Sequence, residues 1–232
     1  MARQETGAVH VARGASYIFL QGIATNILMA AAFAIIARII TTAEMGAMAV
    51  LLMITGASRM ITCLGMPASV TKFVAEQLAI GNREKAAGCF YHALRANLAV
   101  SLPISAAVLL SAPFLSTTLL GTSDKAALFQ ILAFDIIATA GLLPTLNSAM
   151  LGLQKIRRLS MMSIGYMATR QSLIVAFTLL TRSLQGLVMA WLVSELLFAF
   201  ALFFSVHSSL GPPTFSFSLK HLVKFSFPLS LQ

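Results

Sequence analysis

Four ionisable side chains lie inside long apolar stretches of this sequence, where they are best placed to do chemistry. Arg59, Asp135, Arg170 and Glu195 each interrupt a run of predominantly apolar residues, and Arg95 lies near one end of a further run. An ionised group in hydrocarbon costs at least ~2.5–3.5 kcal/mol, so such residues normally face a helix bundle interior or a water-filled cavity. These five residues form the candidate site.

Two interpretations of these charges compete. At a rise of ~1.5 Å per residue, Asp135, Arg170 and Glu195 are predicted to lie at similar depths in their helices. In one interpretation, Arg170 pairs with Asp135 or Glu195 as a structural bridge. In the other, Arg59, Arg170 and Arg95 bind an anionic substrate in a hydrated cavity, and Asp135 and Glu195 couple to an ion or proton. No acidic residue is expected at the depth of Arg59, which favours substrate binding for this residue.

Catalytic and metal-binding motifs are absent or accidental. The sequence contains no Walker A loop, HExxH or GxSxG, and Ser69–Lys72 (SVTK) matches S-x-x-K without the companion motifs of that enzyme class. The four histidines have no metal-ligand spacing, and Cys63 and Cys89 fit neither a disulfide framework nor a zinc site. We therefore expect no enzyme activity, no cofactor and no metal.

The elements that must position the candidate site are membrane-spanning helices. The chain is 58% hydrophobic and only 10% charged, with a mean hydropathy of +0.88, whereas soluble domains carry about 25% charged residues. So few charges could not cover a soluble surface, so lipid must be the outer solvent. The net charge of +9 falls mostly in short clusters between apolar runs. This distribution is typical of a topology signal and argues against a nucleic-acid partner.

The apolar runs predict an all-α integral membrane fold, since ~20 residues suffice to span a bilayer. Residues 1–210 are expected to form a six-helix transmembrane bundle, and residues 211–232 a cytoplasmic connector with the start of a seventh helix. Ser69–Ile80 is amphipathic and is predicted to lie at the membrane surface, Thr117–Lys125 is predicted to be a loop, and Pro103 should kink the third span. The predicted spans are Gly14–Ala37, Met45–Met66, Ala86–Phe114, Ala127–Leu151, Ser160–Leu180 and Leu184–Val206.

Lysine and arginine predict the orientation of the bundle, because cytoplasmic loops carry an excess of these residues. A cytoplasmic N-terminus leaves only Arg38, Lys125 and Arg182 on the outer segments. The basic residues of the inner segments are Arg3, Arg13, Lys72, Arg83, Lys85, Arg95, Lys155, Arg157, Arg158, Lys220 and Lys224. Segments rich and poor in basic residues alternate along the chain from one span to the next. We therefore expect a protein of the cytoplasmic membrane with its N-terminus in the cytoplasm.

Four short motifs follow one another along the chain in an order that resembles a known family. They are Ala37–Gly46 (ARIITTAEMG), Leu64–Phe73 (LGMPASVTKF), Leu151–Lys155 (LGLQK) and Lys224–Leu229 (KFSFPL). Over nearly its whole length the chain resembles the N-terminal half of the prokaryotic polysaccharide biosynthesis or oligosaccharide flippases, in the multidrug/oligosaccharidyl-lipid/polysaccharide exporter superfamily. Thr42 stands where that family often has proline, and Met45 where it has tyrosine.

The resemblance implies two bundles, about 12–14 helices in all, that alternate access to a central cavity. The implied substrate is an oligosaccharide linked to polyprenyl pyrophosphate, and the implied partners are this substrate and membrane lipid. The chain is about half the expected length. We therefore expect a truncated or split protein that does not transport alone and needs a second half-bundle chain or a homodimer.

Three alternatives remain open from the sequence. One is a small-molecule or drug cation antiporter of the same superfamily, which needs acidic residues to dominate its cavity. Another is a membrane-embedded enzyme of lipid-carrier metabolism, which needs clustered acids or histidines in a cytoplasmic loop. The last is a nonfunctional fragment.

Overall fold

The structure, a computed structural model, describes residues 2–63 and 65–213, with side chains from residue 15 onward. These residues form helices and no strands, which confirms the predicted all-α class. The predicted start of a seventh helix lies outside the described residues. The helices are α1 (Ala2–Ile36), α2 (Thr42–Cys63), α3 (Met66–Ala79), α4 (Arg83–Leu110), α5 (Ala112–Leu120), α6 (Ala126–Ile136), the π-helix η1 (Ile137–Leu142), α7 (Leu143–Gly152), α8 (Ile156–Thr181) and α9 (Leu184–Leu210).

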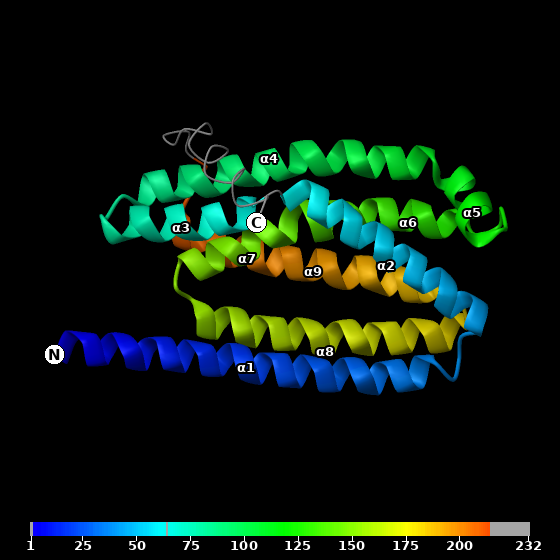
Figure 1. The fold of residues 1–232 in the computed structure, drawn as a ribbon, viewed down its shortest axis with the longest axis horizontal. Coiled ribbons are helices and arrows are strands. Elements are labelled where there is room, and N and C mark those ends of the chain that lie inside the picture. Colours follow the sequence, from blue (N-terminus) through cyan, green and yellow to red (C-terminus); the bar gives the residue numbers. More distant parts are fainter. Residues whose placement is uncertain (1, 64, 214–232) are drawn as a thin grey trace.

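The chain runs back and forth along one long axis (Figure 1). Its passes are α1, then α2 with α3, α4 with α5, the continuous α6–η1–α7 path, α8 and α9. The turns that carry Arg38, Lys125 and Arg182 lie at one end of the bundle, and the turns that precede α4 and α8 lie at the other. The described turns that were predicted to face opposite sides of a membrane are therefore at opposite ends of the bundle.

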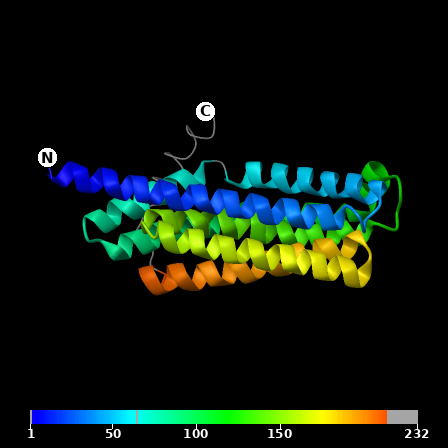
Figure 2. The same ribbon diagram turned by 90° about the horizontal axis from the view of Figure 1, so that it is seen from below.

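Among the described residues, five helical stretches are long and apolar enough to cross a bilayer: Ala15–Ile36, Thr42–Cys63, Arg83–Leu110, Ala126–Gly152 and Leu184–Leu210. The predicted fifth span, in α8, is not among them. Helix α8 has 26 residues, which is enough length, but Arg157, Arg158 and Arg170 make it more polar than the others. Helix α8 packs between α1 and α9, so these neighbours shield part of its polar surface from lipid (Figures 1 and 2).

A capping box fixes the turn between α1 and α2. The Thr41 amide and hydroxyl both donate to Glu44 Oε2, at 2.9 and 3.0 Å, and the Glu44 amide donates to Thr41 Oγ1 at 3.3 Å. This reciprocal arrangement gives hydrogen-bond acceptors to amide groups that have none within the first turn of a helix. Glu44 Oε1 also accepts from the Leu184 amide at 3.3 Å, so one carboxylate caps α2 and the beginning of α9.

Helix α3 does not lie apart on a membrane surface as predicted. It runs beside α4 and α7, with Val70 and Val74 fully buried against them. The contact is close because Gly152 of α7 has no side chain: a Cβ there would lie 2.9 Å from Val74 Cβ. Thr71 Oγ1 also donates to the Ser148 carbonyl of α7 at 3.2 Å. The amphipathic pattern of α3 therefore reflects packing within the bundle.

The third predicted span is divided in two. Helix α4 passes through Pro103 and ends at Leu110, and α5 then covers residues 112–120, most of which were predicted as span end and loop. Pro113 favours this restart because proline fits the first turn of a helix, where its missing N–H is not needed. The α5 helix ends at Gly121, whose φ of 68° suits a residue without a side chain.

The fourth pass contains a π-helical segment that the sequence did not predict. The segment η1 follows α6 directly and leads into Pro144 near the start of α7. Its Gly141 faces Ser101 of α4, whose Oγ would lie 2.5 Å from an added Cβ. Asn97 of α4 donates to Thr145 Oγ1 at 2.7 Å. Such π-helical turns are rare and occur frequently at functional sites.

Candidate functional site

An ion pair between α8 and α9 forms the centre of the site. Arg170 Nη2 lies 3.6 Å from Glu195 Oε1, and both side chains are largely buried, with 20% and 6% exposed. The guanidinium carbon lies 5.5 Å from the ring centroid of Trp191, one turn before Glu195 on α9. Tyr166, one turn before Arg170 on α8, donates its hydroxyl to Glu195 Oε1 at 3.4 Å. One further residue from each helix, Tyr166 of α8 and Trp191 of α9, thus contacts the pair.

Asp135 of α6 joins this pair from a third helix. It is 2% exposed, and α6 packs against α9. Its carboxyl group is close enough to that of Glu195 for one to donate a hydrogen bond to the other when it holds a proton. In the part of the chain that the structure describes, Asp135 Oδ1, Glu195 Oε2 and Arg170 Nε have no hydrogen-bond partner. Buried polar atoms without partners are uncommon and call for an explanation.

The charges of this cluster decide what it can bind. One guanidinium faces two carboxyl groups, so the cluster is neutral when one carboxyl group holds a proton and carries a net charge of −1 only when both are ionised. A proton or a small cation would neutralise that charge, whereas a further anion would increase it. Arg170 as a phosphate ligand stays a prediction, but in this conformation its guanidinium is already paired with Glu195.

Arg59 and Arg95 lie outside this cluster. Arg59 is exposed on α2, where its side chain interacts with Cys63 one turn further on. Its neighbours Met60 and Ile61 are 81% and 54% exposed. Arg95 is exposed on α4. Of the five predicted site residues, the structure therefore brings together Asp135, Arg170 and Glu195, the three that were predicted to lie at similar depths.

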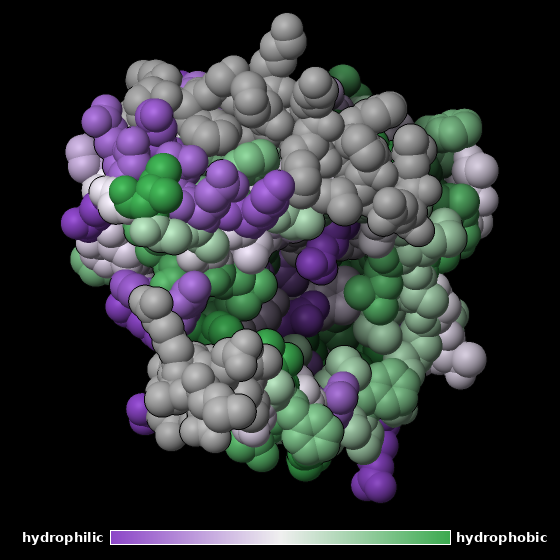
Figure 3. Space-filling model, turned by 60° about the vertical axis from the view of Figure 1, so that its left-hand side comes forward, coloured by the Kyte–Doolittle hydropathy of each residue, from purple (hydrophilic) through white to green (hydrophobic). Residues whose placement is uncertain are grey.

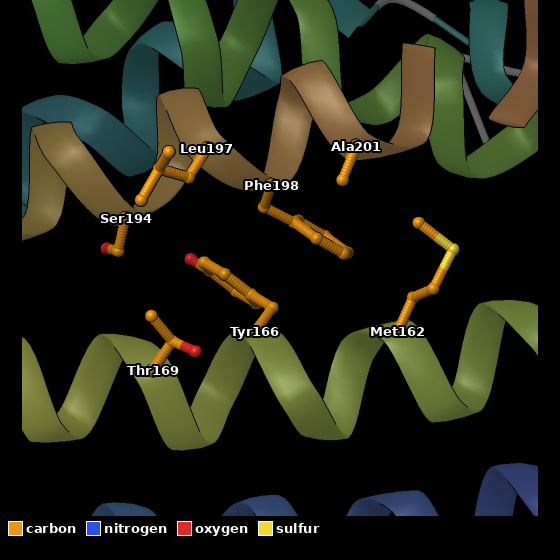
Figure 4. A pocket seen from close by; sticks show the side chains of 7 residues that line it. All are labelled: Met162, Tyr166, Thr169, Ser194, Leu197, Phe198 and Ala201. Atoms are coloured by element: carbon orange, nitrogen blue, oxygen red, sulfur yellow. The ribbon is translucent and has the colours of Figure 1, made fainter. Parts of the chain in front are cut away.

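Tyr166 and Trp191 are site residues that the sequence analysis missed. A signal for them exists, because each lies four residues before a charged residue, Arg170 or Glu195, and therefore on the same face of its helix. Tyr166 also stacks on Phe198 at 4.3 Å between centroids. The rings of Tyr166 and Phe198 both line a slot of about 200 Å³ between α8 and α9 (Figure 4). The other residues that line the slot are Met162, Thr169, Ser194, Leu197 and Ala201.

Metal-binding clusters were not expected from the sequence. Among residues 2–63 and 65–213, no three His, Cys, Asp or Glu side chains are grouped so that they could hold a metal ion.

The described part of the chain is helical, has five stretches that can cross a bilayer and encloses buried charges, so this is a multi-pass membrane protein. Residues 11–232 match a family model described as polysaccharide biosynthesis protein, so the chain belongs to that family. The resemblance stated from the motifs is thereby confirmed. Searches of curated proteins and of solved structures gave no match.

Proposed function

We propose that this chain is a flippase component that moves a polyprenyl pyrophosphate-linked oligosaccharide across the cytoplasmic membrane by alternating access. The family supports a membrane protein of polysaccharide biosynthesis. The observation that carries the finer proposal is the exposed guanidinium of Arg59 within an apolar membrane helix. No enzymatic step, cofactor or metal is part of this proposal.

The surroundings of Arg59 explain why it suggests an anionic substrate. Its helix, α2, is apolar and long enough to span, yet Arg59 is exposed and none of the described carboxylates forms an ion pair with it. A lipid-facing arginine at this depth costs several kcal/mol. A hydrated cavity with a diphosphate removes that cost, because the planar fork of arginine matches phosphate oxygens.

The arrangement of α1 and α2 supports a cavity on this side of the bundle. Helix α1 packs along α8, whereas α2 packs against η1, α4 and α6. Only 6% of the most apolar window of α1 is buried, and 22% of that of α2. These helices therefore offer large surfaces to a further partner, which in this proposal is a second bundle or a second copy of the chain.

We assign the cluster of Asp135, Arg170 and Glu195 to coupling. Its two carboxyl groups share one guanidinium, so one of them can hold a proton or pair with a cation, and exchange of that ion would change the contact between α6, α8 and α9. The adjoining η1 segment, which begins two residues after Asp135, gives α6 a place to change shape. Arg95 is assigned to the same anionic substrate as Arg59.

The N-terminus is proposed to be cytoplasmic. Single cysteines at Lys125 and at Arg157, in a chain with Cys63 and Cys89 replaced by alanine, would test this in intact cells. A membrane-impermeant thiol reagent added outside should label the Lys125 position and leave the Arg157 position unlabelled. The reverse pattern would overturn the orientation.

Loss of the gene tests the transport proposal in the native membrane, where any partner chain is present. Cells without it should accumulate lipid-linked oligosaccharide on the cytoplasmic leaflet, where a glycosidase reaches it in inverted but not in right-side-out vesicles. Equal access from both sides in the deletion strain would contradict a flippase.

One observation favours a second candidate, a cation antiporter. The buried cluster holds two carboxyl groups against one guanidinium, and cation extrusion needs acidic residues at the site. Deletion of the gene separates the two candidates. If the protein is an antiporter, the deletion strain should be more sensitive to a lipophilic cation, and its lipid-linked oligosaccharide should be distributed normally.

A further inference from the structure

We propose that the groove at the start of α8 is a binding site for the diphosphate head group of a polyprenyl lipid. It is distinct from the cluster around Arg170 and from Arg59. The assignment rests on the proposed function, because it names the place where the lipid-linked substrate is first held at the basic end of the bundle.

The groove has a volume of about 580 Å³, and its polar lining consists of three cationic residues and the neutral Gln154. Lys155, Arg157 and Arg158 line it, and within the described residues none of the three is ion-paired with a carboxylate. Their contacts are with neutral groups instead: Lys155 Nζ donates to Ser209 Oγ at 2.6 Å, and Arg157 lies 5.9 Å from the ring centroid of Tyr17. Three uncompensated positive charges in one groove match a diphosphate better than a singly charged phosphodiester.

The backbone beneath these residues is tightly organised. The amide of Lys155 donates to the Met150 carbonyl at 3.1 Å, and the amide of Gln154 to the Leu151 carbonyl at 2.9 Å. This is the Schellman arrangement, and it places Gln154, a non-glycine residue, at a φ of 56°. The turn thereby fixes where the three cations begin on α8.

The position of the cations on α8 also favours an anion. Arg157 and Arg158 occupy the first turn of the helix, which begins at Ile156 and lacks a side-chain cap. The start of a helix carries partial positive charge, so cations there are unfavourable and anions favourable. A bound diphosphate would therefore relieve repulsion from the arginines and from the helix itself.

The groove also has an apolar part, which shares one residue with the slot between α8 and α9. Met161 and Met162 line it beside the cations. Met162 also lines the slot between α8 and α9, where Tyr166 lies further along α8 (Figure 4). The groove thus offers cations for a head group, and apolar side chains beside them for the adjoining isoprenoid.

The hydropathy of the surface agrees with this placement. Viewed towards the end of the bundle where α7 turns into α8, hydrophilic side chains gather around and inside a hollow that apolar surfaces flank (Figure 3). A site for a charged head group on an apolar tail needs both kinds of surface next to each other.

Equilibrium binding of radiolabelled farnesyl diphosphate to the full chain in phosphatidylcholine nanodiscs tests the proposal. The double variant Arg157→Gln/Arg158→Gln should bind the probe at least ~10-fold more weakly than the unaltered chain, because two charge-assisted contacts are lost. The control variant Arg38→Gln/Arg182→Gln removes two exposed arginines from the other end and should bind normally. Arg157→Lys/Arg158→Lys should retain part of the affinity, since it keeps the charges and loses the planar forks.

A competition experiment distinguishes a polyprenyl diphosphate site from a phospholipid site. Nanodiscs that contain phosphatidylglycerol should compete weakly with farnesyl diphosphate, and farnesyl monophosphate should bind more weakly than the diphosphate. Competition by phosphatidylglycerol equal to that of the diphosphate would identify a phospholipid site and overturn the assignment, as would normal binding by Arg157→Gln/Arg158→Gln. The assay does not require transport, so a chain that binds the probe but fails the deletion test would refute only the proposed function.

Discussion

Arg170 and Arg59 both interrupt apolar helices, yet the structure gives them opposite surroundings. Arg170 is largely buried, contacts Glu195 and Trp191, and lies between well-packed helices. Arg59 is exposed among exposed apolar residues on α2. The neighbour that Arg170 contacts, α9, is also more buried than α2: half of the most apolar window of α9 is buried, and only 22% of that of α2. One arginine belongs to the interior of this bundle, and the other belongs to a surface that something else must cover.

The comparison teaches that a charge in a membrane helix does not by itself reveal its role. A buried and paired arginine contributes to helix packing, and its removal leaves its carboxylate partners uncompensated. An exposed arginine contributes little to the folded bundle, so its presence in a span points to a ligand or partner. Stability and transport measurements should therefore separate the two residues.

The largest effect on stability is expected at Arg170. Arg170→Gln would leave Asp135 and Glu195 without their cation, and breaking a buried pair in this way typically costs ~3–5 kcal/mol. Reversible unfolding in mixed micelles would measure the loss, and Arg182→Gln, an exposed change at the end of the same helix, is the control. Adding Glu195→Gln should recover much of the loss. A single variant as stable as the unaltered chain would show that the pair is not structural.

A smaller loss is expected where α3 and α7 meet. In Gly152→Ala the new Cβ would lie 2.9 Å from Val74 Cβ and 3.0 Å from the Thr71 carbonyl oxygen. Overpacking of this kind usually costs ~1–3 kcal/mol. The same unfolding experiment measures it, and pairing with Val74→Ala should reduce the loss because it removes the atoms in conflict. Unchanged stability in Gly152→Ala would contradict the close packing of α3 within the bundle.

The smallest effect, of opposite sign, is expected on the surface that carries Arg59. A Cβ at Gly56 of α2 would meet nothing within 4 Å, and alanine favours a helix over glycine by up to about 1 kcal/mol. Gly56→Ala should therefore leave stability unchanged or raise it slightly. A clear loss of stability in the isolated chain would mean that the α2 surface is already packed.

The passes of this chain could be predicted from the sequence because each one is a long apolar run with polar breaks. The shared depth of Asp135, Arg170 and Glu195 also followed from their positions in those runs. The structure confirms that these three meet, although depth alone left the partner of Arg170 open between two acids. The pairing of helix faces depends on packing between segments that are distant in the sequence. The periodicity of a single helix does not reveal which neighbour its buried face contacts.

Other elements could not be predicted for related reasons. The amphipathic pattern of α3 fits a membrane surface and a bundle interior equally well, and contacts with α7 decide between them. The π-helical η1 segment has no sequence signature beyond a glycine and a following proline. The apolar run around Arg170 suggested an ordinary span, while the place of α8 between α1 and α9 is a property of the assembled bundle.

Transport by an Arg59 variant tests the central claim most directly. The measurement compares the unaltered protein, Arg59→Gln and Arg59→Lys in the native membrane of the deletion strain, scoring how much lipid-linked oligosaccharide reaches the outer leaflet. The account predicts that Arg59→Gln lowers this amount at least ~10-fold, a change of about 1.4 kcal/mol, with Arg59→Lys intermediate. It also predicts normal abundance and an unchanged unfolding free energy, because Arg59 is exposed and outside the buried cluster. Normal transport by Arg59→Gln, or a loss explained by unfolding, would contradict the claim that Arg59 holds the anionic substrate.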